Sequence, residues 1–314
     1  MFRTLGVIVA GITLGACASV AVAEDAHIAR LDISHNKPFV MVTVNGKGPF
    51  RFIIDTGTGG EAFITPSLAE QLDLPRVGQA RLSDPSGKGS RRVPIVLLQS
   101  LQLAGVEFKG VKAAVHELSD SDGRCQGLLG FVLFREYLLT LDYPNRQLRL
   151  TSGELAPDGE QSVLPFRMPD NIPVVSLLVG GARVEAQIDS GGTGLSLPEE
   201  VASRMRFASD PASFSNSHSL STRFEVKGAT LSSDIQLGAY TFKNPFIEIN
   251  PAFPLANFGS CPMKHFAITF DQKKNLIRFD SRQQTQHLSA TPSPMRMQNT
   301  PQEAPPDHAL VPVG

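Results

Sequence analysis

Two short stretches of this 314-residue chain each carry an aspartate, a hydroxyl residue and a glycine in succession. Residues 52–58 read FIIDTGT and residues 186–192 read AQIDSGG, so Asp55 and Asp189 are 189 − 55 = 134 positions apart. Two carboxylates held close together cannot both ionise easily, and they therefore share one proton. The ionised carboxylate can take a proton from water while the protonated one polarises a carbonyl group. The pattern predicts that Asp55 and Asp189 form a catalytic pair for metal-free hydrolysis.

The residues that follow each aspartate fit this chemistry. The hydroxyl groups of Thr56 and Ser190 can hydrogen-bond across to the opposite loop and hold the two carboxylates in register. Gly57 and Gly191 allow the backbone to bend and to approach the partner loop closely. A single triplet of this kind also fits a simpler role, in which the carboxylate caps the backbone of the next segment. Two copies in one repeated frame favour the catalytic interpretation.

Further landmarks repeat in the same order as the two aspartate motifs. An apolar run, an aspartate-led turn and a second short apolar run occur around Asp142 and again around Asp271, an offset of 271 − 142 = 129. Gly130 and Gly259 precede these runs with the same offset. Hairpins in general share such features, but three matched landmarks in one order favour a duplicated unit.

Short runs of β-forming residues separated by turn signals dominate the sequence, as in FVMVTV at 39–44. Helical patterns are confined to residues 66–72, with Thr65 as N-cap and Pro66 at the first helical position, and to residues 198–205. We therefore expect a mainly β protein. The expected parts are a signal peptide (1–23), an N-terminal lobe (28–152), a linker (153–162), a C-terminal lobe (163–282) and a disordered, proline-rich tail (283–314).

On these residues the chain resembles the pepsin and retropepsin superfamily of aspartic peptidases, particularly exported bacterial members with two lobes in one chain. The resemblance covers residues 28–282 and is carried by the two aspartate motifs and by Leu128-Leu129-Gly130. It implies two β-barrel-like lobes related by a pseudo-twofold axis, with a cleft between them. It also implies a flap hairpin, for which residues 81–95 are the best candidate, with a counterpart near 215–227. The site residues that it implies are the catalytic pair Asp55 and Asp189 and the supporting residues Thr56, Gly57, Thr58, Ser190 and Gly191.

The second half departs from the family pattern in two places. Gly192 stands where the family has a serine or threonine whose hydroxyl bonds the adjacent carboxylate, and Thr193 could replace it if the loop differs by one residue. Residues 256–259, ANFG, replace a clean apolar pair before the glycine. These departures motivate an alternative function, in which a catalytically degenerate module grips an extended peptide by strand addition in the same cleft. A self-processing enzyme with one physiological target is a third possibility.

Composition and motif searches argue against several other classes. The net charge is −1, from 29 Lys and Arg against 30 Asp and Glu, and gives no basic excess for a nucleic-acid partner. The seven histidines include no pair at helical metal-ligand spacing, and no Gly-x-Ser-x-Gly nucleophile motif is present. Residues 191–194, GGTG, lack the Lys-Ser/Thr ending of a phosphate-binding loop. We therefore expect no cofactor, no metal and no nucleic acid, an extended polypeptide as substrate, and a monomer, because one chain supplies both aspartates.

The N-terminal residues have the features of an export signal. Arg3 is followed by an uncharged apolar stretch, and AVA at 21–23 fits signal-peptide cleavage. LGAC at 14–17 resembles a lipobox, so a lipoprotein anchored through Cys17 is the alternative and the one expected route to a membrane. The chain is therefore expected to be exported, periplasmic or secreted.

Two cysteines remain after the export signal, Cys125 and Cys261. Their spacing fits no metal-site pattern. An oxidising compartment would permit a disulfide between them, and two separate buried thiols are the alternative.

Overall fold

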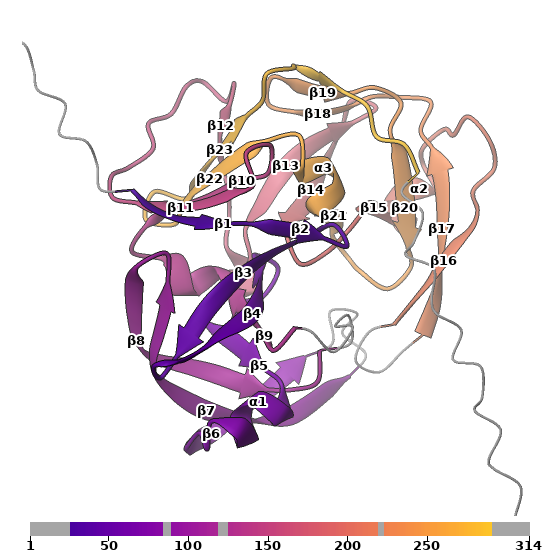
Figure 1. The fold of residues 1–314 in the computed structure, drawn as a ribbon. Coiled ribbons are helices and arrows are strands. Elements are labelled where there is room, and N and C mark those ends of the chain that lie inside the picture. The colour runs from indigo at the N-terminus through magenta and orange to yellow at the C-terminus, as the bar shows by residue number, and fades with distance from the viewer. Residues whose placement is uncertain (1–25, 84–88, 119–124, 219–222, 291–314) are drawn as a thin grey trace, which may run out of the picture.

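The computed structural model describes residues 26–83, 89–118, 125–218 and 223–290. Strands dominate the fold and form three sheets, one in each half of the chain and one that both halves share (Figure 1). The expected export signal, with Cys17, lies outside the described residues, as do residues 291–314 of the expected tail. Within the described ranges, no helix is long and apolar enough to cross a membrane.

The first lobe is built on an eight-stranded sheet. Its order is β2-β3-β4-β9-β5-β8-β7-β6, and a further pairing of β3 with β7 curls the sheet on itself. Strand β3 has seven of its eight residues wholly or partly buried, because this curled sheet encloses the core of the lobe. The elements are β2 (Asp32–Ser34), β3 (Lys37–Val44), β4 (Lys47–Asp55), β5 (Ala62–Ile64), α1 (Pro66–Gln71), β6 (Arg76–Ser83), β7 (Ser90–Leu103), β8 (Val106–Val115), β9 (Gly127–Gly130) and η1 (Phe131–Phe134).

The second lobe is built on a ten-stranded sheet. Its order is β16-β17-β20-β15-β21-β14-β13-β18-β19-β24, so its centre repeats the crossed arrangement of the first lobe. The elements are η2 (Pro169–Asn171), β13 (Val174–Val179), β14 (Ala182–Ile188), β15 (Leu195–Pro198), α2 (Glu199–Ala202), β16 (Ala212–His218), β17 (Arg223–Thr230), β18 (Ile235–Leu237), β19 (Tyr240–Phe242), β20 (Phe246–Asn250), β21 (Ala256–Phe258), α3 (Ser260–Met263) and β24 (Thr285–Gln286).

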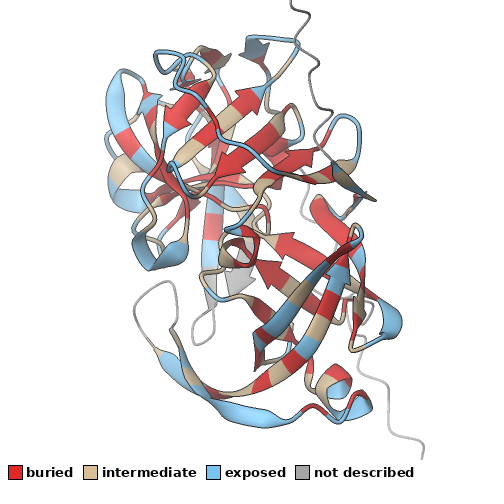
Figure 2. Ribbon diagram, turned by 90° about the vertical axis from the view of Figure 1, so that its left-hand side faces the viewer, coloured by how far each residue is buried: buried red, intermediate tan, exposed pale blue. Residues whose placement is uncertain are grey.

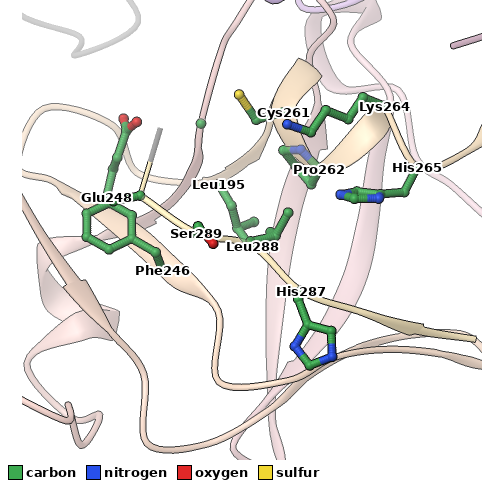
Figure 3. A pocket seen from close by; sticks show the side chains of 12 residues that line it. Leu195, Phe246, Glu248, Cys261, Pro262, Lys264, His265, His287, Leu288 and Ser289 are labelled. Atoms are coloured by element: carbon green, nitrogen blue, oxygen red, sulfur yellow. The ribbon is translucent and has the colours of Figure 1, made fainter. Parts of the chain in front are cut away.

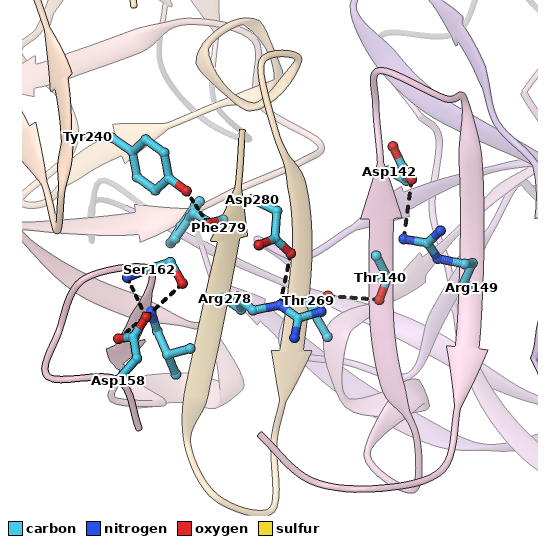
Figure 4. A network of polar contacts seen from close by, with 11 residues as sticks. Thr140, Asp142, Arg149, Asp158, Ser162, Tyr240, Thr269, Arg278, Phe279 and Asp280 are labelled. Carbon is cyan, nitrogen blue, oxygen red and sulfur yellow. Dashed lines mark hydrogen bonds and ion pairs between the residues drawn. The ribbon is translucent and has the colours of Figure 1, made fainter. Parts of the chain in front are cut away.

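Both lobes contribute to the third sheet, which joins them (Figure 4). Its strands, in order, are β1 (His27–Arg30), β11 (Gln147–Thr151), β10 (Leu138–Asp142), β22 (Ala267–Asp271), β23 (Leu276–Asp280) and β12 (Val163–Pro165).

At the centre of this sheet Thr140 faces Thr269, and their buried hydroxyl groups are 2.9 Å apart. These residues are 269 − 140 = 129 positions apart, which is the offset of the sequence repeat. The pseudo-twofold axis that relates the lobes therefore passes between them.

The short helices begin where the sequence places them. Thr65 caps α1, with its hydroxyl accepting a hydrogen bond from the Leu68 N–H at 3.3 Å, and Pro66 occupies the first turn. The second expected helix is shorter than its pattern, because α2 ends at Ala202. Helix α1 follows β5 and helix α2 follows β15, and each of these strands comes after the aspartate motif of its lobe. The two helices therefore occupy equivalent places in the repeat.

One continuous core runs through both lobes (Figure 2). Aromatic rings join the halves, since Phe131 of the first lobe meets Phe270 of the second edge to face, with centroids 5.1 Å apart. Phe166, at the start of the second half, packs on the same Phe131 ring at 6.0 Å. Edge-to-face pairs of buried rings add to the stabilisation from burial alone. The lobes are therefore packed against each other as well as hydrogen-bonded.

The first residues of the expected disordered tail are ordered. Strand β24 pairs in parallel with β19, which places Gln286 opposite Phe242, and Gln286 is 2 % exposed. Leu288 packs against the core, and its carbonyl accepts a hydrogen bond from the Phe246 N–H at 3.0 Å. Composition misplaced the start of the tail, because the polar residues 285–286 join the sheet through backbone hydrogen bonds, and these do not depend on residue type.

The two remaining cysteines are separate buried thiols, and no disulfide joins them. Cys125 lies in the first lobe, where its thiol donates to the Gly127 carbonyl at 3.0 Å. Cys261 lies in α3 of the second lobe.

The Thr140–Thr269 contact leads to a stability prediction. Thr140→Val leaves the Thr269 hydroxyl without its partner in a buried place, and we expect the free energy of unfolding to fall by about 1–3 kcal/mol. Thr140→Val combined with Thr269→Val removes both polar groups, and it should cost less than the sum of the two single changes. Denaturant unfolding of the three variants measures this, and strictly additive losses would show that the contact contributes nothing.

Candidate active site

Asp55 and Asp189 stand at equivalent strand ends in the two lobes. Asp55 is the last residue of β4, and Asp189 directly follows β14. Each strand pairs in parallel with a short strand from later in its lobe, β4 with β9 and β14 with β21. The preceding residues, Ile54 and Ile188, are almost wholly buried, so each aspartate leaves the core at a fixed point.

The loops that carry the aspartates are joined by a reciprocal set of hydrogen bonds. The Thr56 N–H donates to the Ser190 Oγ, and the Ser190 N–H donates to the Thr56 Oγ1, both at 3.0 Å. The Thr56 hydroxyl in turn donates to the Ile188 carbonyl at 2.6 Å, and the Ser190 hydroxyl donates to the Ile54 carbonyl at 2.7 Å. Both hydroxyl side chains are 0 % exposed. Each hydroxyl therefore uses one donor and one acceptor function in a place that water does not reach.

The two motif glycines allow the carboxylates to come together. A Cβ atom on Gly57 would lie 2.5 Å from Cγ of Asp189, and one on Gly191 would lie 2.5 Å from Oδ1 of Asp55. Any side chain at either position would take the place of the opposite carboxylate. The requirement for glycine is thus one of close approach. The structure brings Asp55, Asp189 and their expected supporting residues to one place.

The two carboxylates receive different numbers of hydrogen bonds from their own loops. Asp55 accepts one from the Gly57 N–H at Oδ1 and one from the Thr58 hydroxyl at Oδ2, each at 2.9 Å. Asp189 accepts one from the Gly192 N–H at Oδ1, at 2.8 Å. Hydrogen bonds of this kind stabilise the ionised form of a carboxyl group. Asp189 therefore has one such donor in its own loop, where Asp55 has two.

The electrostatic surroundings act in the same direction. Burial, followed by the charge of Asp55, raises the pKa of Asp189 to about 7. The Gly192 N–H and the charge of Lys37 oppose this rise but do not cancel it. A carboxyl group that shares a buried site with a second carboxylate binds its proton more tightly. The pair therefore keeps a proton well above the usual range of aspartic acid, and Asp189 is the residue that favours it.

Part of the chain is similar to a known protein family. Residues 40–133, which include the first aspartate motif and Leu128-Leu129-Gly130, match the family described as Aspartyl protease. A solved structure of a retropepsin-like aspartic protease from Rickettsia conorii is 22% identical, covers 41% of this chain and 92% of its own, and has a TM-score of 0.31. Curated proteins give no match. The family match ends within the first lobe, so the place of the second lobe in the site comes from the geometry above.

The backbone shows which residue of the second loop corresponds to Thr58. The Thr58 carbonyl accepts a hydrogen bond from the Phe131 N–H at 3.2 Å, and the Gly192 carbonyl accepts one from the Ser260 N–H at 3.0 Å. Gly192 is therefore the true counterpart of Thr58, without a shift of one residue. The suggestion that Thr193 replaces the missing hydroxyl required a loop that differs by one residue, and the backbone register shows no such difference.

A polar pair beside Asp189 was missed as a feature of the site. Asn257 lies opposite Gln187 in the β14–β21 ladder, and the Gln187 amide donates to Oδ1 of Asn257 at 2.9 Å. The corresponding residues of the first lobe, Leu128 and Ile53, are apolar. The sequence repeat could have revealed this pair. It aligns Gln187 with Ile53 and Asn257 with Leu128, so each polar residue of the second lobe replaces an apolar residue of the first.

Hairpins occur at both expected flap positions of the superfamily pattern. Strands β6 and β7 pair antiparallel, with Arg76 opposite Val96, and β16 and β17 pair antiparallel, with Ala212 opposite Gly228. Their tips, residues 84–88 and 219–222, lie outside the described residues.

A cavity of about 340 Å³ lies in the second lobe, and neither aspartate is among its lining residues (Figure 3). Glu248 lies at one side of it, with its carboxyl group against Gly194, and burial raises the pKa of Glu248. Its other polar lining residues are Cys261, Lys264, His265, His287 and Ser289. Within the described part of the chain, neither these residues nor any others form a group of three or more that could hold a metal ion.

The reciprocal hydrogen bonds predict the effect of removing one hydroxyl. Thr56→Val leaves the Ser190 N–H and the Ile188 carbonyl without partners, and we expect a loss of about 2–5 kcal/mol in the free energy of unfolding. Thr56→Ser is the matched control, because it keeps the hydroxyl that the second lobe already uses as Ser190. Denaturant unfolding distinguishes the two. Equal losses would show that packing of the threonine methyl group, and not the hydroxyl, stabilises the junction.

The raised pKa of Asp189 predicts a pH dependence of stability. The folded protein binds this proton more tightly than the unfolded chain, so stability should fall as pH rises from about 4 to about 7. Asp189→Asn is neutral at every pH and should remove this loss, leaving the variant a few kcal/mol more stable than the original protein above pH 7 and similar to it near pH 4.

Asp158 provides a control of opposite sign. Slight burial raises its pKa, but hydrogen bonds from Ser162, Val163 and Gln161 prevail and hold the pKa at about 2. Figure 4 shows Asp158 beside Ser162. Its contribution to stability is present above about pH 4 and is lost as pH falls through about 2. Asp158→Asn should therefore destabilise the protein at pH 7. Unfolding curves at several pH values test both variants, and a stability difference for Asp189→Asn that does not change with pH would contradict the assignment.

Proposed function

We propose that the chain is an aspartic endopeptidase that hydrolyses peptide bonds with a water molecule activated by Asp55 and Asp189. The observation that carries the proposal is the reciprocal Thr56–Ser190 hydrogen bonding, which holds the two carboxylates against each other's loops. Both aspartates keep part of their surface exposed, so water can reach them. The family match of the first lobe supports the same reaction class.

The asymmetry of the pair suggests a role for each carboxyl group. Ionised Asp55, with two donors from its loop, takes a proton from the attacking water, and the water oxygen bonds to the scissile carbonyl carbon. Protonated Asp189 gives its proton to the carbonyl oxygen, which becomes a hydroxyl group. Return of the proton from Asp55 to the amide nitrogen then breaks the carbon–nitrogen bond. One hydroxyl proton goes back to Asp189 as the carboxylic acid product forms.

The proposed substrate is an extended polypeptide that binds between the lobes, in the expected cleft. The hairpins β6–β7 and β16–β17 offer strand edges from both lobes, and an extended chain can bind such edges through main-chain hydrogen bonds. Because one chain supplies both aspartates, we propose a monomer as the active form. We propose export to the periplasm or the medium as its location, with membrane attachment only through Cys17 as a lipoprotein.

A catalytically degenerate peptide-binding module is the second candidate. The observation that favours it is the loss of the Thr58-type hydroxyl at Gly192, which leaves Asp189 with a single donor from its loop. This candidate shares the site and the peptide ligand with the first and differs only in the absence of bond cleavage.

Digestion of an unfolded protein by the purified mature chain tests the proposal. We expect cleavage within the range from about pH 3 to about pH 7, with activity lost as Asp189 gives up its proton near pH 7, and a loss of at least about 100-fold in Asp55→Asn and in Asp189→Asn. Cleavage that persists in both variants would contradict the mechanism. A protein that binds an extended peptide but does not cleave it, with affinity unchanged in both variants, would establish the binding module instead.

A further inference from the structure

The second lobe places a polar pair where the first lobe has an apolar one, directly behind the aspartate. Ile53 lies opposite Leu128 in the β4–β9 ladder, and both belong to an apolar cluster. Gln187 lies opposite Asn257 at the same position of the β14–β21 ladder. Polar side chains that are partly withdrawn from water cost free energy unless they make hydrogen bonds. The pair is therefore a candidate for a role that Leu128 does not have.

The hydrogen bond from Gln187 fixes which end of the Asn257 amide faces Asp189. Since Oδ1 of Asn257 accepts from Gln187, its Nδ2 donor points to the other side. A Cβ atom on Gly192 would lie 2.6 Å from that Nδ2 and 2.5 Å from Oδ2 of Asp189. Both atoms are thus beside the same point. Oδ2 is also the oxygen that the Gly192 N–H does not bond.

The first lobe shows what this place normally holds. Oδ2 of Asp55 accepts a hydrogen bond from the Thr58 hydroxyl at 2.9 Å. Gly192 is the counterpart of Thr58 and has no side chain, while the Asn257 amide occupies the space that a side chain at position 192 would need. The missing hydroxyl at position 192 and the amide donor at position 257 are therefore related, because the Asn257 amide takes the space that a side chain at position 192 would fill.

We propose that Asn257, oriented by Gln187, is a positioning residue for Asp189 and replaces the hydroxyl that position 192 lacks. Its amide donor lies beside Oδ2 of Asp189, from the strand behind, and acts on the charge of that oxygen without the direct hydrogen bond that Thr58 makes to Asp55. The proposal rests on the proposed function in one respect, that Asp189 is one of the catalytic pair.

Other charged and titratable groups also act on Asp189. Asp55 raises the pKa of Asp189, and the charge of Lys37 on β3 lowers it. Tyr143, which follows β10, is itself buried, and its pKa is raised by burial and then by Asp189. Glu248, on β20, has its carboxyl group against Gly194 of the loop that follows Asp189. None of these residues is changed in the variants below, so a shift in Asp189 would report on Asn257.

Asn257→Leu is the first variant, because leucine has nearly the same shape and no donor. We expect kcat to fall about tenfold with little change in KM, since the change affects a carboxyl group and not the binding of the peptide. Loss of the donor disfavours ionised Asp189, so the alkaline limb of the pH–kcat profile should move to higher pH. Asn257→Asp adds a negative charge at the same place and should move the limb further in the same direction.

Leu128→Ala is the matched control at the same ladder position of the first lobe. It removes core volume and should lower stability, but the alkaline limb should stay where it is. A limb that does not move in Asn257→Leu, or one that moves equally in Leu128→Ala, would overturn the proposal and reduce Asn257 to a packing residue.

A rescue experiment tests the proposed exchange of donors. Gly192→Ser should be impaired, because its side chain collides with Asp189 and Asn257. Combined with Asn257→Ala, which clears the space, the same serine should recover kcat relative to Asn257→Ala alone, since its hydroxyl takes the place that Thr58 has on Asp55. A double variant no better than the worse single variant would contradict the exchange.

A carbon-13 NMR titration of the Asp189 carboxyl group separates this inference from the proposed function. The signal is assigned from its loss in Asp189→Asn, and its pKa should rise in Asn257→Leu. This measurement does not need peptidase activity. An inactive protein in which Asn257→Leu raises the pKa of Asp189 would overturn the proposed function and support the role of Asn257. An active protein in which the pKa of Asp189 does not change would support the proposed function and overturn the role of Asn257.

Discussion

The reciprocal hydrogen bonds between Thr56 and Ser190 are the constraint on which the site depends. Each hydroxyl accepts from the opposite backbone and donates to it, in a place where no water can substitute. Sliding one loop past the other by a single residue would leave several buried polar groups without partners, at about 1–3 kcal/mol each. The lobes can therefore meet in only one register. That register brings the glycine of each motif against the carboxylate of the other.

The same axis is fixed a second time at the shared sheet, where Thr140 faces Thr269. Buried phenylalanine rings from both halves fill the space around it. Two separate contacts on one axis define how the lobes are oriented better than either contact alone. A rigid junction of this kind suits a pair of carboxyl groups whose shared proton depends on their separation.

The backbone keeps the twofold relation more closely than the side chains do. Thr58 and Gly192 accept equivalent hydrogen bonds through their carbonyl groups, although one residue has a hydroxyl and the other has no side chain. Backbone hydrogen bonds do not depend on residue type, so the second loop could change its side chains and keep its path. The result is a chemically unequal pair, in which Asp55 receives two donors from its own loop and Asp189 one. Such inequality fits the base and acid roles proposed for the two carboxyl groups.

The sequence by itself determined the features that depend on residue type and order. The aspartate motifs, the repeat offsets and the strand-like runs predicted a mainly β fold of two related lobes, and Thr65 and Pro66 predicted the start of α1. Tertiary structure alone decided which side chains complete the surroundings of Asp189. Asn257 is 68 positions from Asp189 (257 − 189) and comes beside it through the pairing of β14 with β21. Likewise, only the β19–β24 pairing showed that residues 285–286 belong to the folded lobe. The local sequence pattern predicts neither the place of Asn257 beside Asp189 nor the pairing of β24, because both depend on which strands become neighbours. The free energy that selects those neighbours comes from burial of the whole core.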